Sequence, residues 1–287
     1  MTPPILSHAG NLLARYDVLF CDVWGVVHDG ITAFPAACEA LSRFRTNGGT
    51  VILVSNAPVP QERVAAMLDA RAVPRAAFDA IVSSGDIALA HVHEQAYPAL
   101  YCIGPRDRDA ALFAKLSARQ TDLPGADAIL CSGLTDDLNE TAQSYRPLLE
   151  QALARQLPFV CANPDLVVDV GGKHYICAGA IADLYEHMGG PVFWAGKPHP
   201  NAYGTALEVA ERLRLTSVPR GKILAIGDAI RTDLKAAQNA NVDALFIAGG
   251  IHRHDTMTGA LIDPARLVPL FPATAPPALA AMPYLVW

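Results

Sequence analysis

Three aspartates and a lysine stand just beyond short apolar runs, where buried strands are expected to end. Asp22 directly follows one run, Lys197 and Asp228 each follow another within three residues, and Asp233 lies five residues beyond Asp228. A buried carboxylate stays charged only if a cation or hydrogen bonds hold it. Converging carboxylates suit Mg²⁺, which keeps several waters and shares a substrate phosphate. We therefore expect an acidic Mg²⁺ site, with Asp22 as a nucleophile that becomes an aspartyl phosphate.

Each of these residues also has a structural interpretation. Asp22 could cap the next element, Asp233 lies near a helix start where an acid is favoured, and Lys197 could be a solvated loop lysine. The glycine and proline that flank Lys197 favour the catalytic interpretation, because they fix an unusual backbone just past an apolar strand. There the ammonium would offset phosphate charge and screen Asp22 from the other acids.

Ser55 and Asn56 follow a further apolar run, 50–54. Both residue types are good turn and cap formers, which is their structural interpretation. In the functional interpretation, the hydroxyl and nearby backbone N–H groups bind the phosphoryl oxygens, as electrostatic stabilisation of phosphoryl transfer requires.

The elements that must position these residues alternate along the chain. The expected strands are 17–21, 50–54, 80–82, 99–103, 128–131, 159–162, 192–194, 222–226 and 244–247. The expected helices are 36–47, 61–71, 86–95, 107–115, 139–155, 181–187, 201–213 and 232–239. This alternation predicts an α/β fold of right-handed βαβ units, and so many strands favour two sheets. In open parallel sheets, ligands bind beyond the carboxyl ends of the strands, where the candidate residues lie.

The amino-acid composition limits the kinds of partner that the protein is expected to bind. The formal net charge of -6 argues against a nucleic-acid partner and leaves a small phosphorylated substrate open. No uncharged apolar segment approaches the roughly 20 residues that span a bilayer, and the N-terminus does not read as a signal peptide. Six scattered cysteines without a C-x-x-C pair are typical of reduced core residues, so we expect a cytoplasmic protein.

Four segments of the chain resemble, in order, the four motifs of the haloacid dehalogenase superfamily, and most closely its subfamily IIA of NagD-like and pyridoxal-phosphate-phosphatase-like enzymes. They are 22–30 (Asp-Val-Trp-Gly-Val-Val-His-Asp-Gly), 51–58 (Val-Ile-Leu-Val-Ser-Asn-Ala-Pro), 196–200 (Gly-Lys-Pro-His-Pro) and 227–233 (Gly-Asp-Ala-Ile-Arg-Thr-Asp). The resemblance implies a Rossmann-like parallel-sheet core, 1–96 and 191–287, with an inserted α/β cap domain of the C2 type at 97–190. It also implies a Mg²⁺-dependent phosphatase of a small phosphorylated metabolite, such as a sugar phosphate, that acts through an aspartyl phosphate.

The resemblance carries roles over to particular positions. Asp22 looks like the nucleophile and a metal ligand, Lys197 like the third-motif lysine, and Asp228 like a metal ligand that Asp233 supports. Ser55, with Asn56, looks like the phosphate binder.

Two further positions, Asn163 and Asp165, resemble the family's cap segment that faces the active site. They are candidates for substrate selection, although a loop aspartate is as often a turn former. A homodimer is implied by family analogy alone.

Trp24 is the departure from the family pattern. The first motif usually reads Asp-x-Asp-Gly, and its second aspartate serves as general acid and then base. The Trp24 backbone carbonyl can still bind Mg²⁺, but an indole N–H cannot transfer protons near neutral pH. General acid–base catalysis typically increases the reaction rate by about 10²–10⁴-fold.

Three outcomes follow from Trp24. The enzyme is a slow phosphatase that prefers good leaving groups, or another residue substitutes, with His28 and Asp29 nearest in sequence, or the protein binds phosphate compounds without turnover. Phosphonate or carbon–halogen cleavage also stays open. A nucleotide-binding Rossmann domain is disfavoured, because neither G-x-G-x-x-G nor G-x-x-x-x-G-K-[ST] follows a strand.

Overall fold

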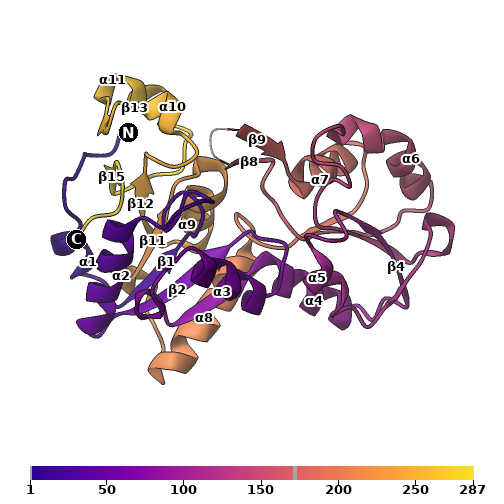
Figure 1. Ribbon diagram of the computed structural model, residues 1–287, viewed down its shortest axis with the longest axis horizontal. Coiled ribbons are helices and arrows are strands. Elements are labelled where there is room, and N and C mark those ends of the chain that lie inside the picture. Colours follow the sequence, from indigo (N-terminus) through magenta and orange to yellow (C-terminus); the bar gives the residue numbers. More distant parts are fainter. Residues whose placement is uncertain (1, 171–172) are drawn as a thin grey trace. The chain divides into compact units, whose positions relative to one another are not determined.

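Asp22, Ser55 and Asp228 lie at or just beyond the ends of strands in a six-stranded sheet. The computed structural model describes residues 2–170 and 173–287 and orders these strands β15-β12-β11-β1-β2-β3 (Figure 1). Their bounds are β1 (Val18–Cys21), β2 (Thr50–Ser55), β3 (Ala80–Ser83), β11 (Ile223–Gly227), β12 (Asp243–Ile247) and β15 (Ala280–Met282). Neighbouring strands from β15 to β2 run parallel, which confirms the predicted α/β fold with a parallel-sheet core.

The register of this sheet decides which residues share an edge. Cys21, the last residue of β1, pairs with Ile226 on β11 and with Leu53 on β2. All four residues of β1 are fully buried, as expected of a parallel strand covered on both faces. The segments that follow β1, β11 and β2 therefore leave the sheet at one edge.

Helices connect these strands. Two long ones, α2 (Pro35–Thr46) and α8 (Pro200–Arg214), begin at prolines, whose fixed φ suits the first helical position. Helix α8 packs on β1 and β2, where the rings of Phe20 and Tyr203 lie 5.1 Å apart. The other helical elements of this unit are α1 (Gly10–Leu13), η1 (Arg75–Ala77), η4 (Arg220–Lys222), η5 (Ile230–Leu234), α9 (Lys235–Ala240), α10 (Arg253–Thr256), α11 (Pro264–Leu267) and η6 (Val268–Leu270). A short antiparallel pair, β13 (Met257–Thr258) and β14 (Leu261–Ile262), lies between α10 and α11.

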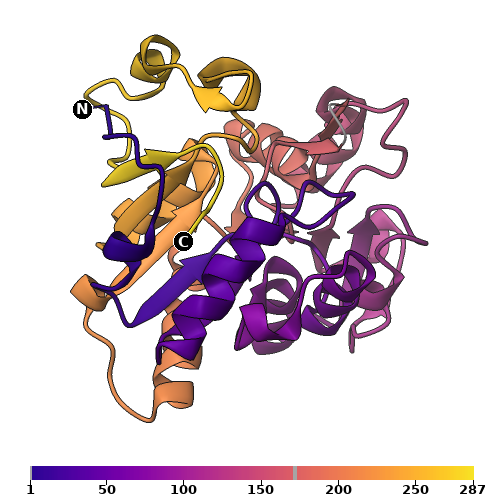
Figure 2. The ribbon, with the colours of Figure 1, turned by 60° about the vertical axis from the view of Figure 1, so that its left-hand side comes forward.

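The C-terminal segment extends the sheet. Strand β15 lies beside β12 (Figure 2), and its residue Ala281 also bonds the N-terminal segment. The Leu6 N–H donates to the Ala281 carbonyl at 2.9 Å, and the Ala281 N–H donates to the Pro4 carbonyl at 2.8 Å. Strand β15, close to the C-terminus, is thus part of the core sheet.

The chain forms two compact units. The first comprises Met1–Ser55, Ala65–Val82 and Lys197–Trp287, and the second comprises Asn56–Val64 and Ser83–Gly196. The expected insertion at 97–190 falls within the second unit wherever the structure describes it. Helix α3 (Gln61–Ala70) begins in the second unit and ends in the first.

The second unit has its own parallel sheet, in the order β10-β7-β6-β4-β5. Its strands are β4 (Ala99–Ile103), β5 (Arg119–Gln120), β6 (Ala128–Cys131), β7 (Phe159–Cys161) and β10 (Val192–Trp194), with an antiparallel pair β8 (Val167–Val170) and β9 (Lys173–Ile176). Its helical elements are α4 (Ser84–Glu94), α5 (Ala110–Phe113), η2 (Leu123–Gly125), η3 (Ala142–Tyr145), α6 (Arg146–Ala154) and α7 (Ala178–His187). Its core includes the fully buried Phe159 and Tyr185, whose rings lie 5.5 Å apart.

The expected strands agree with the structure to within one residue at each end, and two parallel sheets are present as predicted. The helices agree less well. The helix expected over 107–115 is only the single turn α5, and that expected over 139–155 becomes α6 only at Arg146, before Pro147. Within the described residues, no helix is long and apolar enough to cross a membrane.

Candidate active site

The acidic residues meet at the carboxyl edge of the first unit's sheet. Asp22 follows β1, and its backbone N–H donates to the Ile226 carbonyl at 2.8 Å, which continues the β1–β11 ladder by one step. Asp228 follows β11, the neighbouring strand. One carboxylate oxygen from each of Asp22, Asp228 and Asp233 can be chosen so that all three lie within 4.8 Å of one another. Adjacent parallel strands thus bring together acids about two hundred residues apart in the sequence.

Lys197 bridges two of these acids. Its Nζ donates to Asp22 Oδ1 at 2.6 Å and to Asp233 Oδ1 at 2.7 Å. The lysine is only 2% exposed, so it is not a solvated loop residue. Burial alone would lower the pKa of Lys197, but the carboxylates of Asp22 and Asp233 outweigh burial and raise it, so the ammonium stays charged.

The charge of this cluster is not balanced by the lysine alone. Burial raises the pKa of Asp22, and Lys197 opposes that rise. Burial also raises the pKa of Asp228, and the neighbouring charges of Asp22 and Asp233 raise it further. Three carboxylates held around one ammonium favour a divalent cation, and their oxygen donors are those that hard cations prefer. The residues therefore fit the metal that the motifs imply.

Asp233 is fixed by its own turn. Its Oδ2 accepts the Ala229 N–H at 3.0 Å, and the segment between them forms η5. A Cβ added to Gly227 would lie 2.2 Å from the Asp233 Cγ, so only glycine leaves room for this carboxylate. The expected helix over 232–239 is thus divided into η5 and α9, and the buried acid lies within η5.

The boundary between the two units falls between Ser55 and Asn56. Ser55 is buried as the last residue of β2, on the strand next to β1. Asn56 belongs to the second unit, where its Nδ2 donates to Asp165 Oδ1 at 2.9 Å. The Asn163 Oδ1 accepts the Asp165 N–H at 3.1 Å, a local turn contact. The structure therefore groups Asn56 with the two cap candidates, Asn163 and Asp165.

The Trp24 side chain packs on the loop that follows it. Its ring meets the His28 ring edge-on at a centroid distance of 5.1 Å. A Cβ added to Gly30 would lie 2.3 Å from Trp24 Cζ2. The Gly30 carbonyl in turn accepts two hydrogen bonds from the guanidinium of Arg71, at 3.0 and 2.7 Å. The indole thus packs closely on Gly30 and His28, which the sequence does not predict.

His28 has the wrong protonation state for a general acid. It is 2% exposed, and its Nδ1 accepts the Gly30 N–H at 2.9 Å. Burial and, to a lesser extent, the charge of Arg71 lower the pKa of His28 to about 4. The imidazole is therefore neutral at neutral pH and holds the loop together.

Asp29 forms an exposed turn. Its Oδ1 accepts the backbone N–H groups of Ile31 at 2.8 Å and Thr32 at 2.7 Å. Burial favours the neutral form, but these hydrogen bonds together prevail and lower the pKa of Asp29. Such a carboxylate is an ionised turn former and has no proton to give at neutral pH.

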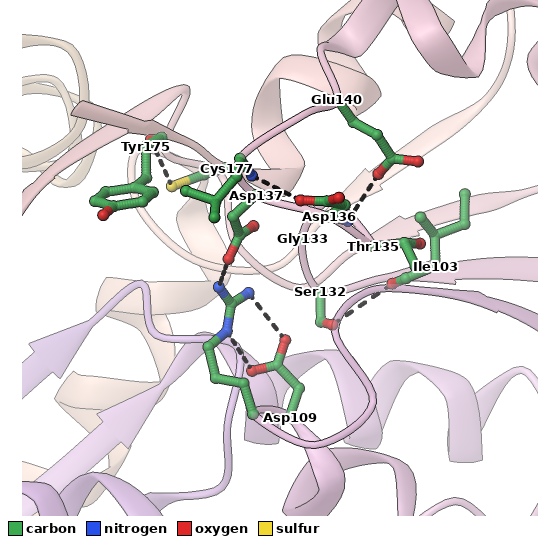
Figure 3. Close-up of polar contacts among 12 residues, drawn as sticks. Ile103, Asp109, Ser132, Gly133, Thr135, Asp136, Asp137, Glu140, Tyr175 and Cys177 are labelled. Atoms are coloured by element: carbon green, nitrogen blue, oxygen red, sulfur yellow. Dashed lines mark hydrogen bonds and ion pairs between the residues drawn. The ribbon is translucent and has the colours of Figure 1, made fainter. Parts of the chain in front are cut away.

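The second unit holds an ion-pair cluster that the sequence analysis missed. Asp109, 1% exposed, and Asp137 both point at one guanidinium (Figure 3). This is Arg108, whose Nε donates to Asp109 Oδ1 at 3.0 Å and whose Nη1 donates to Asp137 Oδ2. A Cβ on Gly133 would lie 2.6 Å from Arg108 Nη2. The cluster ties together the segments that follow β4 and β6, and the adjacent arginine and aspartate after a strand were its signal.

Comparison with known proteins gives two family matches. Residues 19–116 match a family described as haloacid dehalogenase-like hydrolase, and residues 194–272 match one described as HAD-hydrolase-like. A search of curated proteins gave no match.

Solved structures give matches over most of the chain. A hydrolase of the haloacid dehalogenase-like family from Brucella suis 1330 is 39% identical, with a TM-score of 0.85 over 99% of this chain and 100% of that one. A possible sugar phosphatase from Cytophaga hutchinsonii has a TM-score of 0.75 at 17% identity, over 98% of each chain. A glycerol phosphate phosphatase from Mycobacterium tuberculosis, in complex with calcium, has a TM-score of 0.61 at 22% identity, over 84% of this chain and 68% of that one. The last two likenesses concern the fold.

Proposed function

The chain belongs to the haloacid dehalogenase-like family of hydrolases, and we propose that it is a metal-dependent phosphatase of a small phosphorylated metabolite that uses Asp22 as nucleophile. The observation that carries the proposal is the contact of Lys197 with both Asp22 and Asp233 inside a buried acidic cluster. The names of two similar folds, a possible sugar phosphatase and a glycerol phosphate phosphatase, suggest a phosphorylated sugar or polyol.

The proposed reaction has two displacements at phosphorus. An Asp22 carboxylate oxygen attacks, the bond from phosphorus to the leaving oxygen breaks, and that oxygen takes up a proton. Water then attacks the phosphorus, the bond to Asp22 breaks, and the water proton is lost as inorganic phosphate leaves. Lys197 keeps the Asp22 oxygen in place and offsets the charge of the phosphoryl group. Ser55, at the end of the adjacent strand, is proposed to bind a phosphoryl oxygen.

The metal proposed for this site is Mg²⁺. Asp22, Asp228 and the Trp24 backbone carbonyl would hold it, while Asp233 supports the site through Lys197. When bound, the ion supplies positive charge that stabilises the phosphoryl oxygens. A similar fold, the M. tuberculosis phosphatase, is described in complexes with calcium and with magnesium.

The second unit is proposed to act as the cap domain. On this proposal the insertion at 97–190 selects the substrate, and Asn163 and Asp165 contribute through the contact that Asp165 makes with Asn56. A homodimer and a cytoplasmic location complete the proposal, by family analogy and from the cysteine pattern respectively.

The test is phosphate release from p-nitrophenyl phosphate by the wild type, Asp22→Asn and Asp17→Asn. Asp17 lies at the other end of β1, so its variant is the matched control. We expect turnover by the wild type and Asp17→Asn, and none by Asp22→Asn or in the presence of EDTA. Full turnover by Asp22→Asn would contradict the proposal.

A second function is favoured by one observation, the packed indole at the position of the expected acid. With Trp24 seated on Gly30 and with His28 neutral, the protein would bind phosphate compounds without releasing phosphate. Mg²⁺-dependent phosphate binding without turnover of any ester, activated or not, would identify this alternative.

A further inference from the structure

The Asp228 carboxylate lies between two glycines from different loops. A Cβ added to Gly25 would lie 2.0 Å from Asp228 Oδ2, and a Cβ added to Gly250 would lie 2.0 Å from the same oxygen. Real Cβ contacts are never that short, and the neighbour here is a short, buried side chain that cannot swing away. Gly250 therefore owes its identity to the space that the carboxylate fills.

The same segment also bonds the carboxylate. The Ile251 backbone N–H donates to Asp228 Oδ2 at 2.6 Å. Gly250 and Ile251 together thus set where this oxygen lies, one by contact and the other by a hydrogen bond.

The C-terminal segment holds this loop from its other side. The Gly249 N–H donates to the Pro283 carbonyl at 2.8 Å, and the Ala248 N–H donates to the Met282 carbonyl at 2.8 Å. A Cβ on Gly249 would lie 2.4 Å from the Pro283 oxygen and 2.5 Å from the ring of Tyr284. The loop is therefore clamped between Asp228 and the end of the chain.

We infer that the segment 249–251 is a positioning element, which holds the Asp228 carboxylate where it can bind the cation and is itself held by residues 282–284. This inference rests on the proposed function, because it assigns the element to the proposed metal site. Partners that orient a metal ligand typically affect metal affinity by about 10–100-fold when they are changed.

The first test measures Mg²⁺ binding by calorimetry on the full chain, for the wild type, Gly250→Ala and Gly221→Ala. A Cβ on Gly221 meets no atom within 4 Å, so this variant is the control for adding a methyl group. We expect Mg²⁺ affinity to fall about tenfold or more in Gly250→Ala and to stay unchanged in Gly221→Ala. Wild-type affinity in Gly250→Ala would overturn the inference alone, whereas no Mg²⁺ binding by the wild type would overturn the proposed metal site and the inference with it.

A second test works even if Gly250→Ala folds poorly. Asp228→Gly removes the side-chain atoms that the new methyl group would meet. We expect Gly250→Ala to lower the thermal midpoint in the wild-type background and to cost far less in the Asp228→Gly background. An equal loss in both backgrounds would show that Gly250 does not act on Asp228 and would overturn the inference.

Discussion

The Nζ of Lys197 lies 2.6 Å from Oδ1 of Asp22, and both side chains are buried at the edge of a parallel sheet. The two residues are 175 positions apart in the chain. A buried ion pair is weak evidence for stability, because desolvation offsets much of its Coulomb energy. Lys197 also contacts Asp233, and Asp228 lies nearby, so the carboxylates outnumber the ammonium. An ion pair with a purely structural role would not need this excess of negative charge. The arrangement is suited to a dianionic substrate and a divalent cation.

Removal of the lysine should therefore harm both activity and folding. Lys197→Met leaves the Asp22 and Asp233 carboxylates buried without their cation, and breaking a buried pair in this way costs about 3–5 kcal/mol. We expect phosphatase activity to be lost and the free energy of urea unfolding to fall by a similar amount. Lys115→Met is the control, since its pair with Glu62 is exposed and should be worth less than about 1 kcal/mol. Equal effects of the two substitutions would contradict this interpretation.

The close packing of the Trp24 indole on Gly30 predicts that alanine costs more stability at Gly30 than at Gly48. Gly30 and Gly48 have nearly the same φ, +91° and +89°, but only a Cβ on Gly30 would meet other atoms, those of Trp24. Alanine at either position carries the same backbone strain, so Gly30→Ala should cost about 1–3 kcal/mol more than Gly48→Ala. Urea unfolding measures both.

A double variant isolates the contact between Gly30 and Trp24. In a Trp24→Ala background, the cost of Gly30→Ala should approach that of Gly48→Ala, because the ring is gone. A persistent difference would mean that another neighbour determines the glycine.

The neutral His28 predicts a dependence of stability on pH. Its pKa is about 4 in the folded protein and about 6.5 when exposed, so the unfolded chain binds more protons between these values. The stability from a neutral His28 is full above about pH 6.5 and is lost as the pH falls to about 4, to a total of about 3 kcal/mol. Arg71 and Asp29 are the charges that face it, and they act in opposite directions.

The measurement compares urea unfolding at pH 7.5 and pH 4.5 for the wild type and His28→Asn. Asparagine can keep an acceptor for the Gly30 N–H without titrating. We expect the wild type to lose about 2–3 kcal/mol more than the variant over this interval. The same loss of stability in both proteins would show that the pKa of His28 is not lowered by folding, so that the folded protein protonates His28 by pH 4.5.

The strands and the acidic cluster could be predicted because their signals are local. Parallel strands buried on both faces are continuous apolar runs, and the sheet rule then places the side chains that follow them. The alanine-rich strand β15 lacks the β-branched residues that mark a strand, so the sequence does not predict it. The predicted strands likewise do not include β8 and β9, although these two strands pair in the structure.

The environment of Trp24 was beyond the sequence for a different reason. The motif shows that an acid is missing. The packing of Trp24 on Gly30, however, also involves Arg71, which contacts Gly30 from the end of α3. The contact of Asn56 with Asp165 likewise joins residues 109 positions apart, and neither segment predicts it. Such pairings follow from the path of the whole chain and leave no mark in either segment.

In the proposed function, Asp22 accepts phosphoryl groups while position 24 provides no acid. The most direct measurement compares wild type and Trp24→Asp on p-nitrophenyl phosphate, whose leaving group needs no proton, and on glycerol phosphate, whose leaving group does. We predict that the wild type hydrolyses both esters, the second far more slowly than the first, and that Trp24→Asp raises kcat/KM for glycerol phosphate by about 10²-fold or more relative to p-nitrophenyl phosphate. Two results together would contradict this proposal. The wild type would hydrolyse both esters equally fast, and Trp24→Asp would leave the ratio of the two rates unchanged.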